Sequence, residues 1–166
     1  MKSPLRVLFL CTGNSARSQM AEALMNAKSR GRFVAESAGS RPADRVNPFA
    51  VEALREIGID WSGRTPRSVD GLVEQRWDFV ITVCDRAKEA CPILPGHPVH
   101  VHWGMEDPAE IEGSDPEKAR AFTAARVLLA RRIDLMLALP IEKLQRLSLG
   151  RRLDEIASAT QAMTLP

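Results

Sequence analysis

Long hydrophobic runs are missing from this sequence. Near the N-terminus the longest apolar run is four residues, Val7 to Leu10, too short for a signal-peptide core or a transmembrane helix. The sequence therefore predicts neither a signal peptide nor a membrane span, and we expect a cytoplasmic protein.

An excess of charge of either sign is also missing. The 23 Lys and Arg residues and the 21 Asp and Glu residues leave a net charge of +2. This balance gives no argument for nucleic acid or an acidic membrane as a partner. A binding site for an anion must therefore come from a local cluster of residues.

Cysteine is scarce, with three residues in the chain. In a reducing compartment an odd number of cysteines does not indicate a structural disulfide framework, and it suits one reactive thiol plus a pair better. The chain also has no low-complexity segment and no convincing internal repeat.

The first distinct motif combines a strand, a loop and a helix. The apolar run Val7–Leu10 predicts a buried strand, the loop Cys11–Ser18 follows without a break, and Gln19–Ala27 has the pattern of a helix. Such a loop turns its backbone N–H groups toward one point, where the helix dipole also favours an anion. Because these surroundings lower a thiol pKa from roughly 8.5 to about 3.5 to 7.5, we predict that Cys11 is a thiolate nucleophile at neutral pH.

The same loop has residues suited to a tetrahedral oxyanion. Five residues separate Cys11 from Arg17, enough for the chain to circle the anion and return the guanidinium to the sulfur, where it grips two oxygens. Gly13 and Asn14 tolerate unusual backbone angles, and Ser18 can donate a hydrogen bond to the thiolate. The predicted oxyanion-binding residues are Thr12, Gly13, Asn14, Ser15, Ala16, Arg17 and Ser18. The alternative is that Cys11 is a small buried hydrophobe at the end of a strand.

Strands and helices continue to alternate along the chain. The further predicted strands are Phe33–Ala35, Trp77–Val83 and Val99–Trp103, the predicted helices are Asn47–Ile57 and Ser114–Leu139, and a helical turn is predicted at Val69–Glu74. This order predicts an α/β three-layer sandwich, with a four-stranded parallel sheet in the order 2-1-3-4 flanked by helices. The Cys11 loop then lies at the switch point where such sheets bind ligands, and Cys84 ends the neighbouring strand at the same edge.

We expect one catalytic domain over residues 1–140. The 166 residues with 45% hydrophobic content suffice for a single core. Past Pro140, apolar residues from Leu144 to Ile156 are spaced among basic ones, which predicts a C-terminal amphipathic helical extension over residues 141–166. This helix either packs on its own domain or forms a dimer contact.

Three separate motifs follow one another in the chain. Cys11–Glu22 reads CTGNSARSQMAE, Cys84 and Cys91 are separated by six residues, and His102–Gly104 precedes Asp107–Ala109. Together they resemble the signature, the redox pair and the acid loop of the arsenate reductases that have the low-molecular-weight protein tyrosine phosphatase fold. The resemblance covers roughly residues 5–139.

The resemblance implies a three-thiol reaction. Cys11 attacks arsenate held by the loop and Arg17, with phosphate or sulfate as analogues, while Asp107 protonates the departing oxygen. Cys84 then attacks Cys11 and releases arsenite, and Cys91 attacks Cys84 and frees Cys11. Thioredoxin is the external reductant that we expect, and some relatives use glutathione or mycothiol instead.

The resemblance implies no bound cofactor and, in some members, a potassium ion. Asn14, Glu22 and Ser37 resemble ligands of that ion, but the remaining carboxylate has no counterpart after Arg67. We therefore expect no tightly bound metal and at most a weak potassium site.

The nearest alternative is a low-molecular-weight protein tyrosine phosphatase. It would hydrolyse phosphomonoesters through a phosphocysteine intermediate with Cys11, Arg17 and Asp107 alone. Such enzymes usually have a tyrosine after their Asp-Pro pair, whereas this chain has no tyrosine and Ala109 follows Pro108. The sequence therefore favours the reductase.

Three further alternatives concern single features. Cys84, Cys91, His100 and His102 are four candidate zinc ligands, although their spacing is not that of a known zinc finger. The two later cysteines can instead be core residues, and Asp107 can serve only to open a turn. A silent anion-binding regulator is the last alternative, and no residue favours it.

Overall fold

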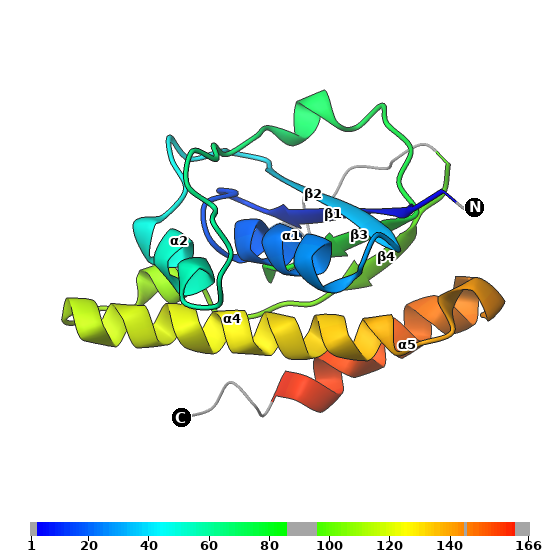
Figure 1. Ribbon diagram of the computed structural model, residues 1–166. Helices are drawn as coiled ribbons and strands as arrows, with labels where there is room; N and C mark the ends of the chain where they lie inside the picture. Colours follow the sequence, from blue (N-terminus) through cyan, green and yellow to red (C-terminus); the bar gives the residue numbers. More distant parts are fainter. Residues whose placement is uncertain (1–2, 86–95, 145, 162–166) are drawn as a thin grey trace.

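A computed structural model of the protein describes residues 3–85, 96–144 and 146–161. Its centre is a parallel sheet with the strand order β2-β1-β3-β4 (Figure 1). The strands are β1 (Leu5–Cys11), β2 (Phe33–Gly39), β3 (Phe79–Thr82) and β4 (Val99–His102). The predicted fold class and strand order are confirmed.

Helices lie against this sheet and against one another. They are α1 (Arg17–Lys28), α2 (Pro48–Arg55), α4 (Asp115–Leu137) and α5 (Arg146–Thr160), with short 3-10 helices at Val69–Gly71, Pro108–Glu110 and Ile141–Lys143. α1, α2 and α4 contact each other, and α5 contacts both α4 and β4. In Figure 1 the yellow α4 runs along the whole length of the domain, with α5 beside its C-terminal part. Within the described residues, no helix combines the length and apolarity needed to cross a bilayer.

The apolar pattern of each strand follows its place in the sheet. β1 and β3 are central strands, and every residue of β3 is buried, because a parallel strand with neighbours and cover on both faces has no solvent side. β4 is at the edge, where Val99 and Val101 are buried while His100 is exposed. The parallel register pairs Leu10 with Thr82, so β1 and β3 end at the same edge.

Side-chain caps are present at the starts of two predicted helices. The Asn47 side chain accepts a hydrogen bond of 2.9 Å from the Phe49 N–H, and Pro48 is the first residue of α2. Ser114 and Glu117 form a reciprocal capping box at the start of α4. These local contacts explain why both helices begin where the sequence predicts.

Several predicted ends differ from the structure by a few residues. β3 begins at Phe79 rather than at Trp77, because the Trp77 indole N–H donates to the Leu72 carbonyl and Asp78 accepts from the Arg6 N–H. The chain bends at Asp78, directly before the strand starts. α1 begins at Arg17, two residues before the predicted start.

The end of β2 touches the loop that follows β1. A methyl group placed on Gly39 would collide with the Thr12 carbonyl and lie 3.0 Å from the Asn14 nitrogen. The Arg41 N–H also donates to the Thr12 carbonyl at 2.9 Å. Gly39 is therefore required for the close approach of these two segments.

Replacement of Gly39 by alanine should destabilise the fold and displace the loop. We expect Gly39→Ala to lower the free energy of unfolding by about 1 to 3 kcal/mol, because backbone atoms cannot yield to the added carbon. Urea denaturation measures this loss. Gly71→Ala is the matched control, since no heavy atom lies within 4 Å of the added carbon there. Equal stability of the two variants would contradict the prediction.

Candidate active site

The loop between β1 and α1 forms one wall of a cavity of about 460 Å³. Cys11 is the last residue of β1 and Arg17 the first of α1, so Thr12 to Ala16 bridge the two elements. The opposite wall comes from Cys84, which follows β3, and from residues 105–107, which follow β4. Three segments far apart in the sequence therefore meet at the carboxyl edge of the sheet.

The Cys11 thiol is deeply buried, with 4% of the residue exposed. Its sulfur lies 2.8 Å from the Ser18 hydroxyl and accepts a hydrogen bond of 3.2 Å from the Asn14 N–H. Burial nevertheless raises the pKa of Cys11, and it outweighs the hydrogen bonds from Ser18 and Asn14 and the charge of Arg17. The predicted lowered pKa is therefore corrected, because the sequence showed the stabilising groups but not the loss of solvent.

Asn14 holds the loop in its curved shape. It has a positive φ of 50° and is fully buried. Its amide nitrogen donates to the hydroxyls of Ser18 at 2.8 Å and Ser37 at 2.9 Å. Its amide oxygen accepts from the Arg67 N–H at 2.8 Å and from the Gln19 side chain at 3.0 Å. One side chain thus joins the loop to α1, to β2 and to the segment that contains Arg67.

Arg17 is fixed by the loop that follows β4. Its Nη1 donates to the Met105 carbonyl at 2.9 Å, and its Nη2 lies 3.3 Å from Asp107 Oδ2. The other carboxylate oxygen of Asp107 accepts from the Ala109 N–H at 2.9 Å and caps the short helix there. Asp107 therefore opens a turn, as one alternative from the sequence has it. It also lines the cavity.

Cys84 lies buried beside the loop. Its sulfur is 3.5 Å from the Thr12 hydroxyl, and both residues line the cavity that contains Cys11. The structure thus brings two of the predicted thiols to one cavity. Cys91, the third predicted thiol, lies outside the described residues.

The three residues predicted as a weak potassium site lie within hydrogen-bond distance of one another, and the ion itself stays a prediction. The Ser37 hydroxyl donates to Glu22 at 2.7 Å and accepts from the Asn14 amide nitrogen at 2.9 Å. Glu22 already faces the guanidinium groups of Arg64 and Arg67, each 3.7 Å away. Burial raises the pKa of the Glu22 carboxyl, and these arginines oppose the shift. The Glu22 carboxylate is thus already paired with two cations of the chain itself.

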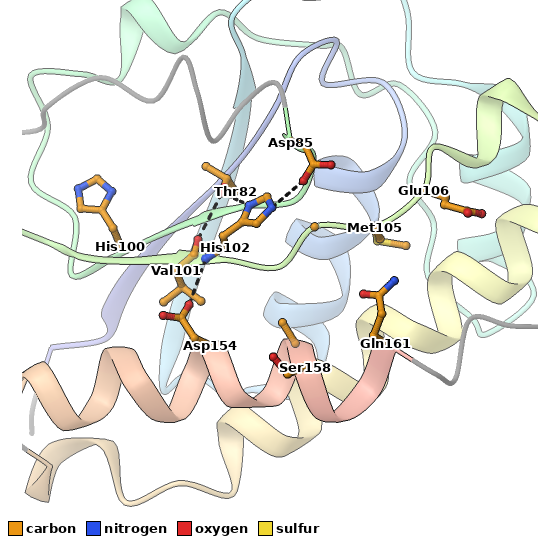
Figure 2. A pocket seen from close by; sticks show the side chains of 12 residues that line it. Thr82, Asp85, His100, Val101, His102, Met105, Glu106, Asp154, Ser158 and Gln161 are labelled. Atoms are coloured by element: carbon orange, nitrogen blue, oxygen red, sulfur yellow. Dashed lines mark hydrogen bonds and ion pairs between the residues drawn. The ribbon is translucent and has the colours of Figure 1, made fainter.

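The described members of the alternative zinc set, Cys84, His100 and His102, do not form a metal-ligand group. Both ring nitrogens of His102 are engaged, one with the Thr82 hydroxyl at 2.7 Å and the other with Asp85 at 2.9 Å, as Figure 2 shows. The His100 side chain points away from this pair in the same view. Among the residues that the structure describes, no group of three or more His, Cys, Asp or Glu side chains is arranged to hold a metal ion.

Sequence reasoning missed two features of the site. The anchor of Arg17 is the backbone carbonyl of Met105, and a carbonyl leaves no signal in the sequence. The pairing of Glu22 with Arg64 and Arg67 had a partial signal, since arginines are frequent in the segment 55–67. Only the fold shows which carboxylate they face.

Comparisons with known proteins agree with this geometry. The arsenate reductase of Halalkalibacterium halodurans is 44% identical over 127 residues, which are 76% of this chain and 91% of that protein. A solved structure described as an arsenate reductase in the phosphate binding state superposes with a TM-score of 0.65 at 30% identity, covering 81% of this chain and 97% of that one.

A second solved structure is a thioredoxin-dependent arsenate reductase from Corynebacterium glutamicum. It has a TM-score of 0.56 and 31% identity, over 81% of this chain and 65% of that one. The resemblance to arsenate reductases is therefore confirmed. Residues 6–146 match the model of the low molecular weight phosphotyrosine protein phosphatase family, and this chain belongs to that family.

Proposed function

We propose that this protein reduces arsenate to arsenite. The observation that carries the proposal is the presence of two thiols, Cys11 and Cys84, in the cavity that also contains Arg17. Reduction of arsenate requires two electrons, and a pair of thiols supplies them as it forms a disulfide. The reductase names of the relatives support the same activity.

The first step joins Cys11 to arsenic. The loop amides and Arg17 bind the oxyanion, and the Cys11 sulfur attacks the arsenic atom while one oxygen leaves as water. Asp107 supplies a proton to that oxygen, a role supported by its place beside Arg17 in the cavity. Because the thiol is buried, its own proton passes to a bound oxyanion oxygen as the bond forms.

The second step is the reduction itself. Cys84 attacks the Cys11 sulfur, a Cys11–Cys84 disulfide forms, and the electron pair of the sulfur–arsenic bond stays on arsenic, which departs as arsenite. The 3.5 Å contact with Thr12 supports this role by holding the Cys84 sulfur at the loop. Cys91 then attacks Cys84 and releases Cys11 as a thiol.

We propose thioredoxin as the external reductant, acting in a reducing cytoplasm. Its dithiol would exchange with the Cys84–Cys91 disulfide. Thioredoxin would then carry the disulfide, and Cys84 and Cys91 would be thiols again. The support is the name of one structural relative, a thioredoxin-dependent arsenate reductase. Glutathione and mycothiol are the two other reductants to be tested.

Hydrolysis of a phosphomonoester is the less supported function. It would use Cys11, Arg17 and Asp107 but would give Cys84 no role in the cavity. Ala109 also follows Pro108, and no tyrosine of the chain can wall a pocket for an aryl phosphate.

Replacement of any of the three cysteines should stop arsenate turnover. We expect Cys11→Ser, Cys84→Ser and Cys91→Ser each to lose arsenite release with thioredoxin, thioredoxin reductase and NADPH. Cys11→Ser should also lose binding of arsenic to the protein, because its thiol makes the first bond. Arsenite detection and mass spectrometry measure the two effects.

The outcomes separate the reductase from its alternatives. Turnover that appears only with glutathione or mycothiol would contradict thioredoxin coupling. Untouched arsenate together with hydrolysis of an aryl phosphate through Cys11 would contradict the reductase.

Ser18 should lower the pKa of the nucleophile. Its hydroxyl lies 2.8 Å from the Cys11 sulfur, and a hydrogen bond to a charged group contributes about 1.5 to 3 kcal/mol. In a Cys84→Ser/Cys91→Ser background, Ser18→Ala should move the pH midpoint of Cys11 alkylation upward by about 1 unit or more. Iodoacetamide labelling across a pH series measures the midpoint. Ser62→Ala, at an exposed position, is the control, and an unmoved midpoint in Ser18→Ala would refute the role.

Asp107 should contribute through its proton. We expect Asp107→Asn to lower kcat for arsenate by about 100-fold, since a positioned general acid contributes about 10²–10⁴-fold. The amide keeps the cap on the Ala109 N–H but cannot protonate the leaving oxygen. Glu112→Gln is the control, at an exposed carboxylate between the same short helix and α4 that does not line the cavity. A wild-type kcat in Asp107→Asn would show that the side chain only caps the turn.

A further inference from the structure

Helix α5 covers the residues with which β4 ends. The Trp103 indole N–H donates to the Leu153 carbonyl at 2.9 Å, and the His102 N–H points to the Asp154 carboxylate at 3.5 Å. Figure 2 shows Asp154, Ser158 and Gln161 on the face of α5 toward the β4 strand and the loop after it. The family match ends at residue 146, so α5 is an addition to the matched part of the fold.

Arg132 of α4 connects α5 to the residues that follow β4. Its guanidinium is fully buried, with Nη1 donating to the carbonyls of Trp103 at 2.9 Å and Gly104 at 3.2 Å. Nε donates to the Thr160 hydroxyl at 3.0 Å, and Nη2 donates to the Gln161 side chain at 3.3 Å. One side chain of α4 therefore joins the end of α5 to the start of residues 103–107, which we call the acid loop.

The charge of Arg132 has an unusual environment. In the part of the chain that the structure describes, no carboxylate lies within ion-pair distance of its guanidinium. Desolvation lowers its pKa to about 10, so the group stays charged at neutral pH. Carbonyl groups and the C-terminal end of α5, where the helix dipole is negative, stabilise this cation. Its guanidinium nitrogens donate to four partners at once, so these hydrogen bonds connect the positions of α5 and residues 103–104.

The next carbonyl in the sequence, that of Met105, accepts a hydrogen bond from Arg17 of the oxyanion loop. Trp103 and Gly104 accept from Arg132, and Met105 accepts from Arg17 at 2.9 Å. Arg17 in turn lies 3.3 Å from Asp107 in the same loop. Three consecutive carbonyls are thus held by two arginines, one on the side of α5 and the other in the cavity.

We propose that α5 and Arg132 position the acid loop, so that Arg132 is a positioning residue for Arg17 and Asp107. Loss of its hydrogen bonds would let the carbonyls of residues 103–105 move, and the Arg17 guanidinium would move with the Met105 carbonyl. A misplacement of about 1 Å can cost about 100-fold in rate. This inference rests on the proposed roles of Arg17 and Asp107 in binding and protonating the oxyanion.

The test removes the contacts of Arg132 one side at a time. The double variant Thr160→Val/Gln161→Leu deletes the α5 partners of Arg132 at nearly constant volume. Arg132→Met deletes the guanidinium itself. Thr160→Ser keeps the hydroxyl that accepts from Arg132. Glu155→Gln, on the exposed side of α5, is the control. Two readouts are used: kcat and KM for arsenate, and the inorganic phosphate concentration that half-protects Cys11 from iodoacetamide. Circular dichroism melts establish which variants fold.

We expect Arg132→Met and the Thr160→Val/Gln161→Leu pair to reduce kcat/KM by about tenfold and to raise the half-protecting phosphate concentration by about threefold or more, since Arg17 grips the anion. Thr160→Ser and Glu155→Gln should match the wild type. Folded variants with wild-type kinetics and wild-type phosphate protection would overturn the proposal and leave Arg132 a purely structural residue. If Arg132→Met does not fold, the kinetics and phosphate protection of the Thr160→Val/Gln161→Leu variant decide whether Arg132 positions the acid loop.

The same assays separate this inference from the proposed function. A wild-type protein that is protected by phosphate but releases no arsenite with any thiol reductant would refute arsenate reduction. The phosphate-protection comparison would still decide the role of Arg132, because it requires no turnover.

Discussion

The hydrogen bonds of the buried Asn14 side chain are the interaction on which the rest of the site depends. A residue with a positive φ carries a backbone cost that its surroundings must offset, and here four contacts of one amide do so. They fix the loop against α1, β2 and the Arg67 backbone. The direction of the Asn14 N–H toward the Cys11 sulfur follows from that fixation.

Burial and charge oppose each other throughout this site. The Cys11 thiol and the Glu22 carboxyl both have raised pKa values because both are removed from solvent, and in each case nearby cations and hydroxyl groups reduce the shift. The hydroxyls of Ser18 and Ser37 stand on either side of the Asn14 amide. The nucleophile and the carboxylate are thus connected by one line of hydrogen bonds through the interior.

The acid loop has support from both directions. On the cavity side Arg17 binds the Met105 carbonyl and faces Asp107, and on the far side Arg132 binds the two preceding carbonyls. Trp103, fully buried, fills the space between the sheet and α5 and lies 6.5 Å from the Phe9 ring. The loop that supplies the proposed proton donor is therefore part of the core contact between the domain and α5.

The sequence by itself determined the sheet, its strand order and the place of the Cys11 loop, because apolar periodicity, Asn47 and Ser114 caps and the α/β alternation are local signals. It also placed Cys84 at the right edge, since this residue follows a predicted strand, while the family resemblance supplied Asp107. Only the tertiary structure decided the direction of the Cys11 pKa, the partners of Glu22 and the anchor of Arg17. Loss of solvent, the approach of distant side chains and the position of a backbone carbonyl are properties of the packed chain, and no single stretch of residues encodes them.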